Sequence, residues 1–253
     1  MVIVKAPLQQ VIELENKIFL LKILSPEISN SIKPGQFLNV LVTNSYYPLL
    51  RRPFSVCDVE DDCFYLMFNI FGEGTKLLSG KRPGDLIDVL GPLGNGFNLE
   101  DDYETAVLVA GGLGAAPFPY LVRKIQDKKN IVSFIGGRTQ QDVIMYGMKN
   151  VHISTDDGSL GFKGTVVDLL KDQIELIKTS KVKMFGCGPT AMLRSLQKFC
   201  IENNLNCEVS TECAMACGFG ICQGCPVEGV NSPDKYLLVC KNGPVFNVKD
   251  IVL

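Results

Sequence analysis

TAVLVAGGLGAAPF (residues 105–118) reads as a strand, a turn and the first residues of a helix. Its first residues form an unbroken apolar run, the pattern of a strand buried on both faces within a parallel sheet. Glycines in the turn that follows would let the backbone approach the phosphates of a dinucleotide. The candidate contacts are Gly111, Gly112 and Gly114. Because GGxGxxP differs from the more common GxGxxG, this turn alone does not identify a nucleotide site.

Strands and helices alternate from this stretch to about residue 207, which predicts a parallel sheet with helices on both faces, of the dinucleotide-binding kind. The later strands are expected at 131–137, 151–155 and 182–188, and the helices at 121–129, 166–177 and 190–204.

GCGPTAM (186–192) is a second glycine turn that ends a strand and opens a helix. Turns at the carboxyl ends of parallel strands line one crevice. We therefore expect Gly188 and Pro189 to lie beside the first turn, with Cys187 at the floor of the crevice. A packed thiol without a ligand is the alternative for Cys187.

Residues 1–98 contain short runs rich in Val, Ile, Leu and Phe, separated by Pro and Gly, which predicts a small antiparallel barrel or sandwich. RRPFSV (51–56) lies in one expected strand. Its basic pair is either solvated or binds a phosphate through Arg52, with Phe54 and Ser55 beside a flat ring. EGTKLL (73–78) places a Gly-Thr turn at an apparent helix start, where free N–H groups attract a pyrophosphate. We also expect a short helix and turn within 77–85.

The ten cysteines are concentrated near the end of the chain, where six lie from Cys207 to Cys240. Four of them have the spacing C-x4-C-x2-C, followed by one more cysteine: Cys217, Cys222, Cys225 and Cys240. This is the plant-type spacing of a [2Fe-2S] cluster. Structural zinc usually uses two C-x2-C pairs, and a cytosolic chain seldom has a disulfide framework, so the spacing favours the cluster over zinc or free thiols. Cys213 is then a bystander or a substitute ligand.

The last segment, from Glu208 onward, has little apolar periodicity, so we expect something other than a hydrophobic core to hold it. The remaining thiols read as small buried hydrophobes: Cys57, Cys63, Cys200 and Cys207.

Composition excludes several functions. The chain has 253 residues and a net charge of −2, so it offers no basic field for nucleic acid or an anionic membrane. An apolar run long enough to cross a bilayer is absent, and the start MVIVKAPLQQ does not resemble an export signal, which predicts a cytoplasmic protein. His152 is the single histidine; we expect it to be packed in the core, and a histidine-based triad has no support.

RPFS, GT, GGLGAAP and GCGP occur in this order before the cysteine set, and together they resemble the ferredoxin-NADP reductase superfamily over nearly the whole chain. Within it the chain is most similar to the family of electron-transfer subunits of NAD-dependent dihydroorotate dehydrogenase. STDDGSLGFKGTV (154–166), MACGFGICQGCPV (215–227) and YLLVCKNGPVF (236–246) carry that likeness.

This resemblance implies an α+β chain of three parts: an antiparallel β-barrel that binds FAD (1–98), an α/β domain that binds NAD (99–207) and a [2Fe-2S] segment (208–253). It assigns the cluster to the four spaced cysteines. The implied FAD contacts are Arg52, Pro53, Phe54, Ser55, Met67, Phe68, Asn69, Gly74 and Thr75. Relatives commonly have a basic residue at the position of Asn69, so we expect one phosphate contact to be weaker in this chain. They often have Glu-Arg at the positions of Cys213 and Ala214, so we expect the local packing there to differ.

The implied activity is electron transfer from an FMN-containing catalytic subunit, through the cluster and FAD, to NAD+ in pyrimidine synthesis, within a heterotetramer of two copies of each subunit. A flavin belongs between nicotinamide and cluster because it exchanges both electron pairs and single electrons. The alternative is the flavin subunit of a ferredoxin-NADP oxidoreductase, sulfide dehydrogenase or hydrogenase complex, whose first cluster ligand tends to be aspartate where this chain has Cys217. NAD in preference to NADP rests on the resemblance, since Arg138 could meet a 2′-phosphate.

Overall fold

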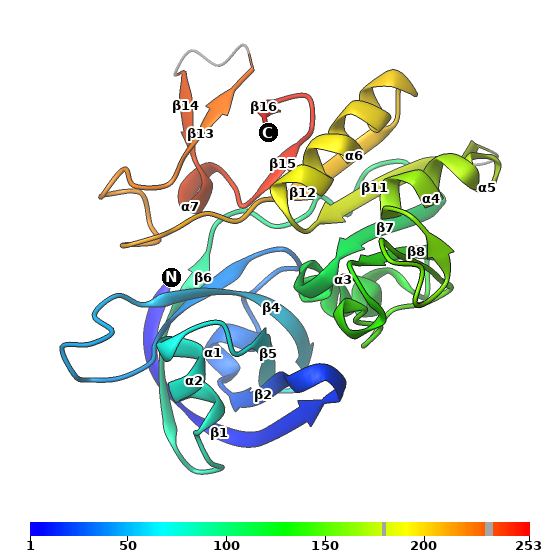
Figure 1. Ribbon diagram of the computed structural model, residues 1–253. Coiled ribbons are helices and arrows are strands. Elements are labelled where there is room, and N and C mark those ends of the chain that lie inside the picture. Colours follow the sequence, from blue (N-terminus) through cyan, green and yellow to red (C-terminus); the bar gives the residue numbers. More distant parts are fainter. Residues whose placement is uncertain (179–180, 231–234) are drawn as a thin grey trace.

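The computed structural model of the chain describes residues 1–178, 181–230 and 235–253. Its first part is a closed antiparallel barrel with the strand order β1-β2-β5-β4-β3-β6 (Figure 1). The strands are β1 (Val2–Leu14), β2 (Ile18–Leu24), β3 (Phe37–Leu41), β4 (Arg52–Glu60), β5 (Cys63–Asn69) and β6 (Leu86–Leu93). Alternate side chains point inward and form a core that includes Phe54, Phe64 and Phe68. The expected barrel is confirmed.

Two short helices accompany the barrel, α1 (Pro26–Ser29) and α2 (Glu73–Ser79). The start of α2 at Glu73 agrees with the reading of 73–78 as a helix start. The short helix and turn expected within 77–85 are present as the last residues of α2 and a turn at 83–84, although the helix begins earlier than that range.

The second part is a seven-stranded sheet of order β10-β9-β8-β7-β11-β12-β15, parallel except for β15. Its strands are β7 (Thr105–Gly111), β8 (Asn130–Gly137), β9 (Val151–Thr155), β10 (Phe162–Lys163), β11 (Val182–Cys187), β12 (Asn206–Ser210) and β15 (Val245–Asn247). Residues of β7 are buried on both faces, as the unbroken apolar run predicted.

Helices cover both faces of this sheet. α3 (Phe118–Ile125) packs on the face that contains Ala106 and Leu108, whereas α4 (Val166–Asp172) and α6 (Thr190–Glu202) pack on the face that contains Val107 and Val109. The expected single helix at 166–177 is two helices, α4 and α5 (Ile174–Lys178), because the backbone of Gln173 leaves the helical region.

The C-terminal segment lies above the barrel and beside the sheet in Figure 1. It contains a three-stranded sheet of order β14-β13-β16 and one short helix. Its elements are β13 (Pro226–Gly229), β14 (Tyr236–Leu238), α7 (Val239–Asn242) and β16 (Ile251–Val252), with β15 returning to pair with β12.

The expectation that this segment lacks a hydrophobic core is wrong. Leu238, Val239 and Phe246 are buried in the same apolar cluster as Val107 and Val109 of the large sheet. Each contributing stretch is only a few residues long and lies between turns, so the segment adds apolar area without a helical or strand period.

His152 is half-buried rather than fully packed in the core, and its ring stacks on Phe134 at a centroid distance of 5.0 Å. The four thiols expected to be small buried hydrophobes are all buried: Cys57, Cys63, Cys200 and Cys207. Among the described residues, no helix is both long enough and apolar enough to cross a membrane.

Candidate functional site

Two glycine turns meet at the carboxyl edge of the large sheet. β7 and β11 are neighbouring strands, with Ala110 opposite Cys187, so the turns that follow them are adjacent. A Cβ atom on Gly114 would lie 2.3 Å from the carbonyl oxygen of Cys187, and one on Gly111 would lie 2.9 Å from the Pro189 ring. Any side chain at these glycines would push the turns apart. The structure therefore brings the two predicted nucleotide turns together.

Cys187 lies below these turns and is fully buried. Burial raises the pKa of its thiol well above the usual range, which keeps the sulfur protonated. It is a neutral, compact group at the end of β11, which fits both the floor of a nucleotide site and a packed thiol without a ligand.

The barrel contributes a second group of predicted contacts on β4 and β5. Arg52, Pro53 and Ser55 are half-exposed, and Asn69 is exposed at the end of β5. In contrast, the rings of Phe54 and Phe68 pack together in the barrel core with centroids 5.7 Å apart.

The start of α2 lies beside Arg52. A Cβ atom on Gly74 would lie 3.1 Å from Nε of Arg52, so the glycine allows close approach of the guanidinium. Thr75 Oγ1 accepts hydrogen bonds from the N–H groups of Phe71 and Gly72, at 2.9 and 3.2 Å. This hydroxyl closes the turn, while Arg52 remains the cationic group at its side.

The four spaced cysteines form two neighbouring pairs. Sγ atoms of Cys225 and Cys240 lie 3.1 Å apart, and Sγ of Cys217 accepts the N–H of Cys222 at 3.5 Å. Each of the ten cysteines carries a free thiol. Among the described residues, no three metal-binding side chains converge on a single ion. Two sulfur pairs are the donor set that a two-iron cluster requires, whereas one zinc ion needs a single tetrahedron.

The loop around Cys217 is arranged to hold a thiolate. Burial opposes ionisation, but backbone N–H groups of Cys222, Phe219 and Ile221 outweigh it and lower the pKa of the Cys217 thiol to about 6. Gly218 and Gly220 have φ values of +80° and +94°, which aim these N–H groups inward at little steric cost. The glycines between the cysteines thus supply hydrogen bonds to sulfur.

Cys213 lies next to this set but faces a different environment. Burial, and then the adjacent Cys225, raise the pKa of its thiol to about 12. It is half-buried and packs against the shared apolar cluster. This environment favours Cys213 as a bystander thiol over Cys213 as a substitute ligand.

Comparison with known proteins places this arrangement in a family. Residues 212–252 match the model of the iron-sulfur cluster binding domain of dihydroorotate dehydrogenase B. The chain is 36% identical to the dihydroorotate dehydrogenase B (NAD(+)) electron transfer subunit of Desulforamulus reducens, over 88% of this chain and 87% of that one. It is 35% identical to the subunit of the same name from Bacillus velezensis, over 95% of each chain.

The chain belongs to the dihydroorotate dehydrogenase B electron transfer subunit family.

Solved structures agree with the fold of this family. An NADH-dependent reduced ferredoxin-NADP oxidoreductase matches with a TM-score of 0.85 and 27% identity, over 98% of this chain and 90% of that chain. A ferredoxin-NADP+ reductase of Neisseria gonorrhoeae, with bound FAD and NADP, matches with a TM-score of 0.65 and 19% identity, over 79% of this chain and 91% of that chain. The expected superfamily is confirmed.

Contacts between the barrel and the large sheet were not predicted from the sequence. Arg123 of α3 makes a bidentate pair with Asp58 of β4, with N–O distances of 2.7 and 2.6 Å. The Tyr120 hydroxyl donates to the Ile32 carbonyl oxygen, and its ring lies in the barrel core. In this chain α3 therefore fixes the glycine turn that precedes it relative to the barrel. In the sequence, Arg123 and Tyr120 look like ordinary charged and aromatic helix residues, so their contacts with the barrel could not be predicted.

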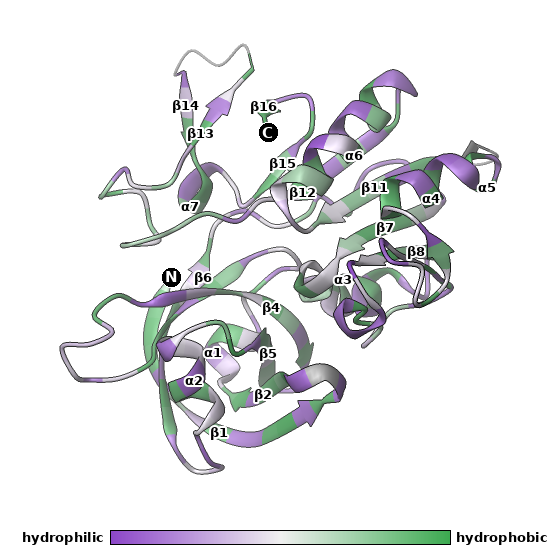
Figure 2. Ribbon diagram, viewed as in Figure 1, coloured by the Kyte–Doolittle hydropathy of each residue, from purple (hydrophilic) through white to green (hydrophobic). Residues whose placement is uncertain are grey.

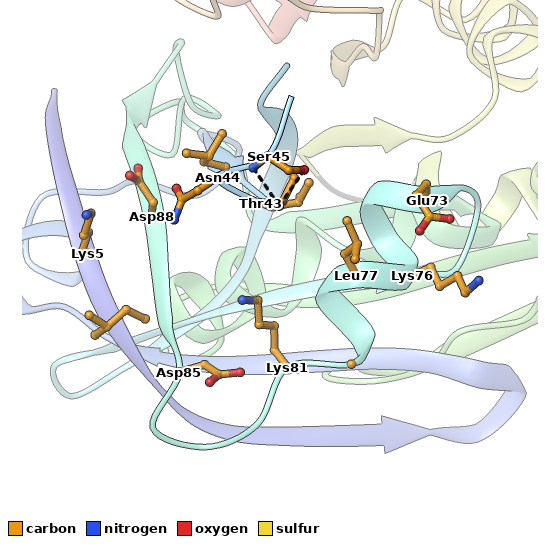
Figure 3. A pocket seen from close by; sticks show the side chains of 14 residues that line it. Lys5, Thr43, Asn44, Ser45, Glu73, Lys76, Leu77, Lys81, Asp85 and Asp88 are labelled. Carbon is orange, nitrogen blue, oxygen red and sulfur yellow. Dashed lines mark hydrogen bonds between the residues drawn. The ribbon is translucent and has the colours of Figure 1, made fainter. Parts of the chain in front are cut away.

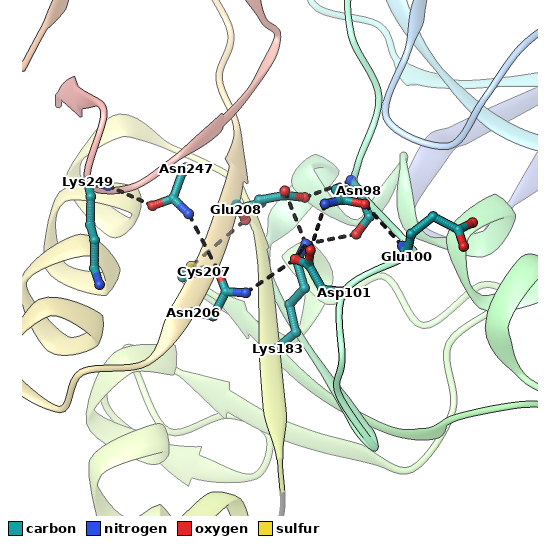
Figure 4. A network of polar contacts seen from close by, with 9 residues as sticks. All are labelled: Asn98, Glu100, Asp101, Lys183, Asn206, Cys207, Glu208, Asn247 and Lys249. Carbon is teal, nitrogen blue, oxygen red and sulfur yellow. Dashed lines mark hydrogen bonds and ion pairs between the residues drawn. The ribbon is translucent and has the colours of Figure 1, made fainter.

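A second connection joins the segment after the barrel to the sheet and is shown in Figure 4. Lys183 of β11 is fully buried; its ammonium bonds to Asp101, to Glu208 at 3.1 Å and to the carbonyl oxygen of Asn98 at 2.8 Å. Glu208 also accepts the N–H of Asn98 at 2.9 Å. A lysine inside a predicted buried strand was the available signal for this network.

Asn39 connects the barrel to the cysteine loop. Its side-chain amide donates to the carbonyl oxygen of Cys217 at 3.3 Å, although the two residues are far apart in the sequence. A Cβ atom on Gly218 would lie 2.1 Å from Nδ2 of Asn39. The cysteine loop therefore rests directly on β3.

Proposed function

We propose that this chain is the electron-transfer subunit that connects an FMN-containing dihydroorotate dehydrogenase catalytic subunit to NAD+, using FAD and a [2Fe-2S] cluster. The observation that carries the proposal is the joint placement of two cysteine pairs, a cationic barrel edge and two adjacent glycine turns on one framework. When bound, the flavin exchanges a hydride with nicotinamide and single electrons with the cluster. The three-part division at residues 98 and 207 and the heterotetramer of two copies of each subunit belong to this proposal.

The chain's own residues position each group. In our proposal Gly111, Gly112 and Gly114 lie against the dinucleotide phosphates. Gly188 and Pro189 flank the nicotinamide end, and buried Cys187 excludes water there. Because Arg123 and Tyr120 hold α3 against the barrel, this crevice has a fixed position relative to β4.

FAD is assigned to the barrel face toward that crevice. The proposed contacts are Arg52, Pro53, Phe54, Ser55, Met67, Phe68, Asn69, Gly74 and Thr75. Arg52 supplies the charge for a phosphate, and Ser55 is half-exposed beside it. Since Phe54 and Phe68 are packed in the core, we assign them to shaping the face, and the polar contacts to their neighbours.

Cys217, Cys222, Cys225 and Cys240 are the proposed cluster ligands, with each pair on one iron. N–H groups directed at Cys217 stabilise negative charge on sulfur. Cys222 is exposed, so a cluster that it holds would be accessible to a partner.

NAD rather than NADP is the proposed co-substrate. The Arg138 side chain is exposed, but its Nε lies 3.9 Å from the carboxylate of Asp142, and Asp156 and Asp157 follow the adjacent strand β9. A 2′-phosphate near Arg138 would meet these carboxylates as well.

We expect Arg52→Ala to bind FAD roughly ten- to 150-fold more weakly than the wild type, because one charged hydrogen bond to phosphate contributes about 1.5–3 kcal/mol. Flavin retention during dilution and fluorescence titration of the apoprotein measure this. Arg51→Ala is the matched control, since Arg51 pairs with the Asp88 carboxylate at 2.7 Å, whereas the Arg52 guanidinium donates to the carbonyl oxygen of Leu50. Equal FAD affinity in Arg52→Ala and the wild type would remove Arg52 from the site.

Reconstitution tests the function itself. The isolated chain should oxidise NADH with artificial dyes, since nicotinamide and FAD suffice for that reaction. It should reduce NAD+ with dihydroorotate only after the FMN catalytic subunit is added. Rapid dihydroorotate oxidation by the isolated chain would contradict this division of labour. If reduced ferredoxin, sulfide or hydrogen supports the reaction and dihydroorotate does not, the partner belongs to one of the alternative complexes.

A further inference from the structure

We propose that the loop at 44–50, between β3 and β4, forms one docking surface with the cysteine loop 217–225, and that the FMN catalytic subunit binds this surface. The inference rests on the proposed function, because it takes that subunit as the electron donor. It adds a part of the barrel that contributes no cofactor contact.

Strand register places the two loops on one face of the barrel. Ile3, Leu90 and Asn39 lie opposite one another on β1, β6 and β3, so their side chains point to the same side. Asn39 binds Cys217, which identifies this as the side that supports the cysteine loop. Thr43, at the base of the loop 44–50, follows Asn39 by a strand distance of about 13 Å.

Both loops carry exposed apolar side chains. Tyr46 is 97% exposed and Leu49 is 69% exposed in the barrel loop, while Ile221 is 76% exposed between two cluster ligands. Ile3 and Phe219 add to them. In Figure 1 the barrel loop and the cysteine loop both project to the left of the molecule, and Figure 2 shows hydrophobic residues, in green, on the barrel loop. Exposed apolar groups gathered in this way mark protein–protein contact sites.

A broad hollow of about 770 Å³ lies beside the barrel loop on the same face (Figure 3). Lys5, Lys76 and Lys81 line it together with Glu73, Asp85 and Asp88. The balance of three cations against three carboxylates does not favour a phosphate ligand. A wide, mixed-charge hollow beside apolar side chains is the composition of a protein-binding rim.

A stable protein–protein interface is large enough to include both loops. A stable interface buries about 800 Å² on each partner, which corresponds to a disc of about 16 Å radius. Its diameter of about 32 Å is more than twice the strand distance from Asn39, which supports the cysteine loop, to Thr43 at the base of the barrel loop. Any protein that exchanges electrons with the cluster must cover the cysteine loop. A second copy of this chain on the same face would block the cluster, so the catalytic subunit is the occupant.

The test compares binding of two double variants to the purified FMN catalytic subunit encoded in the same genome. We expect Tyr46→Ser with Leu49→Ser to weaken binding roughly ten- to 1,000-fold in calorimetric titration, as for loss of central apolar contacts. FAD content and the NADH–dye rate should stay at wild-type values. The matched control is Leu176→Ser with Ile201→Ser, two exposed apolar side chains on α5 and α6 at the opposite side of Figure 1, and it should bind like the wild type.

Hydrogen exchange on the wild-type complex provides an independent measurement that needs no variant. Backbone amides at 43–50 and 217–224 should exchange more slowly in the complex than in the free chain. If the wild type couples to dihydroorotate while the Tyr46–Leu49 variant binds normally and 43–50 stays unprotected, the docking surface is wrong and the proposed function stands. Failure of the wild type to bind the catalytic subunit would overturn both. Self-association that is lost in the Tyr46–Leu49 variant would assign the loop to a second copy and overturn the inference.

Discussion

We expect Cys222→Ser to reduce dihydroorotate-dependent NAD+ reduction by the assembled complex to the background rate, while NADH oxidation with artificial dyes continues. Cys222 forms one of the two sulfur pairs with Cys217, and serine offers no thiolate for iron. Losing one of the four proposed ligands would leave an iron with incomplete coordination, and Cys222 itself is exposed. The visible absorption and the paramagnetic signal of the cluster should disappear, and FAD should remain.

Cys213→Ser is the matched control for that experiment, because Cys213 lies beside Cys225 but outside the four-cysteine pattern. It should keep the cluster and the coupled reaction. If the cluster survives Cys222→Ser but disappears in Cys213→Ser, then Cys213 is the ligand and Cys222 is the bystander. Stoichiometric zinc without labile sulfide in the wild type would reject the cluster altogether.

Lys183→Met should lower the free energy of unfolding by about 2–4 kcal/mol. Removing one partner of a buried ion pair typically costs about 3–5 kcal/mol, because the opposing charge remains without compensation. Here the partners are partly in contact with water, since the Asp101 side chain is 33% exposed and that of Glu208 is 13% exposed, which reduces the cost. Denaturant unfolding followed by far-ultraviolet circular dichroism measures the change.

Lys181→Met provides the comparison for this variant. Lys181 precedes the same strand and pairs with Asp102 at 2.6 Å, but both side chains are largely exposed, so we expect less than about 1 kcal/mol. Equal losses in the two variants would show that burial of Lys183 has no special role. Adding Glu208→Gln to Lys183→Met should recover part of the loss, since it removes one uncompensated carboxylate.

The same network predicts a pH dependence of stability. A hydrogen bond from Lys183 lowers the pKa of the Asp101 carboxyl below the usual value of about 3.9. Burial of the carboxyl opposes this shift, and the positive charge of Lys183 adds to it. A lowered carboxyl pKa stabilises the folded state at pH values above the unfolded pKa, and this contribution is lost as the pH falls through the folded pKa. The difference in stability between wild type and Lys183→Met should therefore shrink below about pH 4.

The amino-acid sequence by itself determined the parts of this protein that depend on local pattern. The unbroken apolar run at 105–110 predicted a strand buried on both faces, and the spacing of Cys217, Cys222 and Cys225 predicted a cluster-binding loop. These features could be read because periodicity and ligand spacing act over a few residues. The motif order RPFS, GT, GGLGAAP and GCGP then indicated the superfamily.

Only the tertiary structure decided how those parts meet. The Asp58–Arg123 pair, the Lys183 network and the contact of Asn39 with Cys217 join residues that are far apart in the chain, and no local pattern marks their partners. The C-terminal segment lacked apolar periodicity, yet its core contacts exist because Leu238 and Phe246 fold back onto the face of a sheet built elsewhere in the chain. The side of the barrel on which the cysteine loop rests also follows from strand register, because register and closure of the barrel set the side to which Asn39 points.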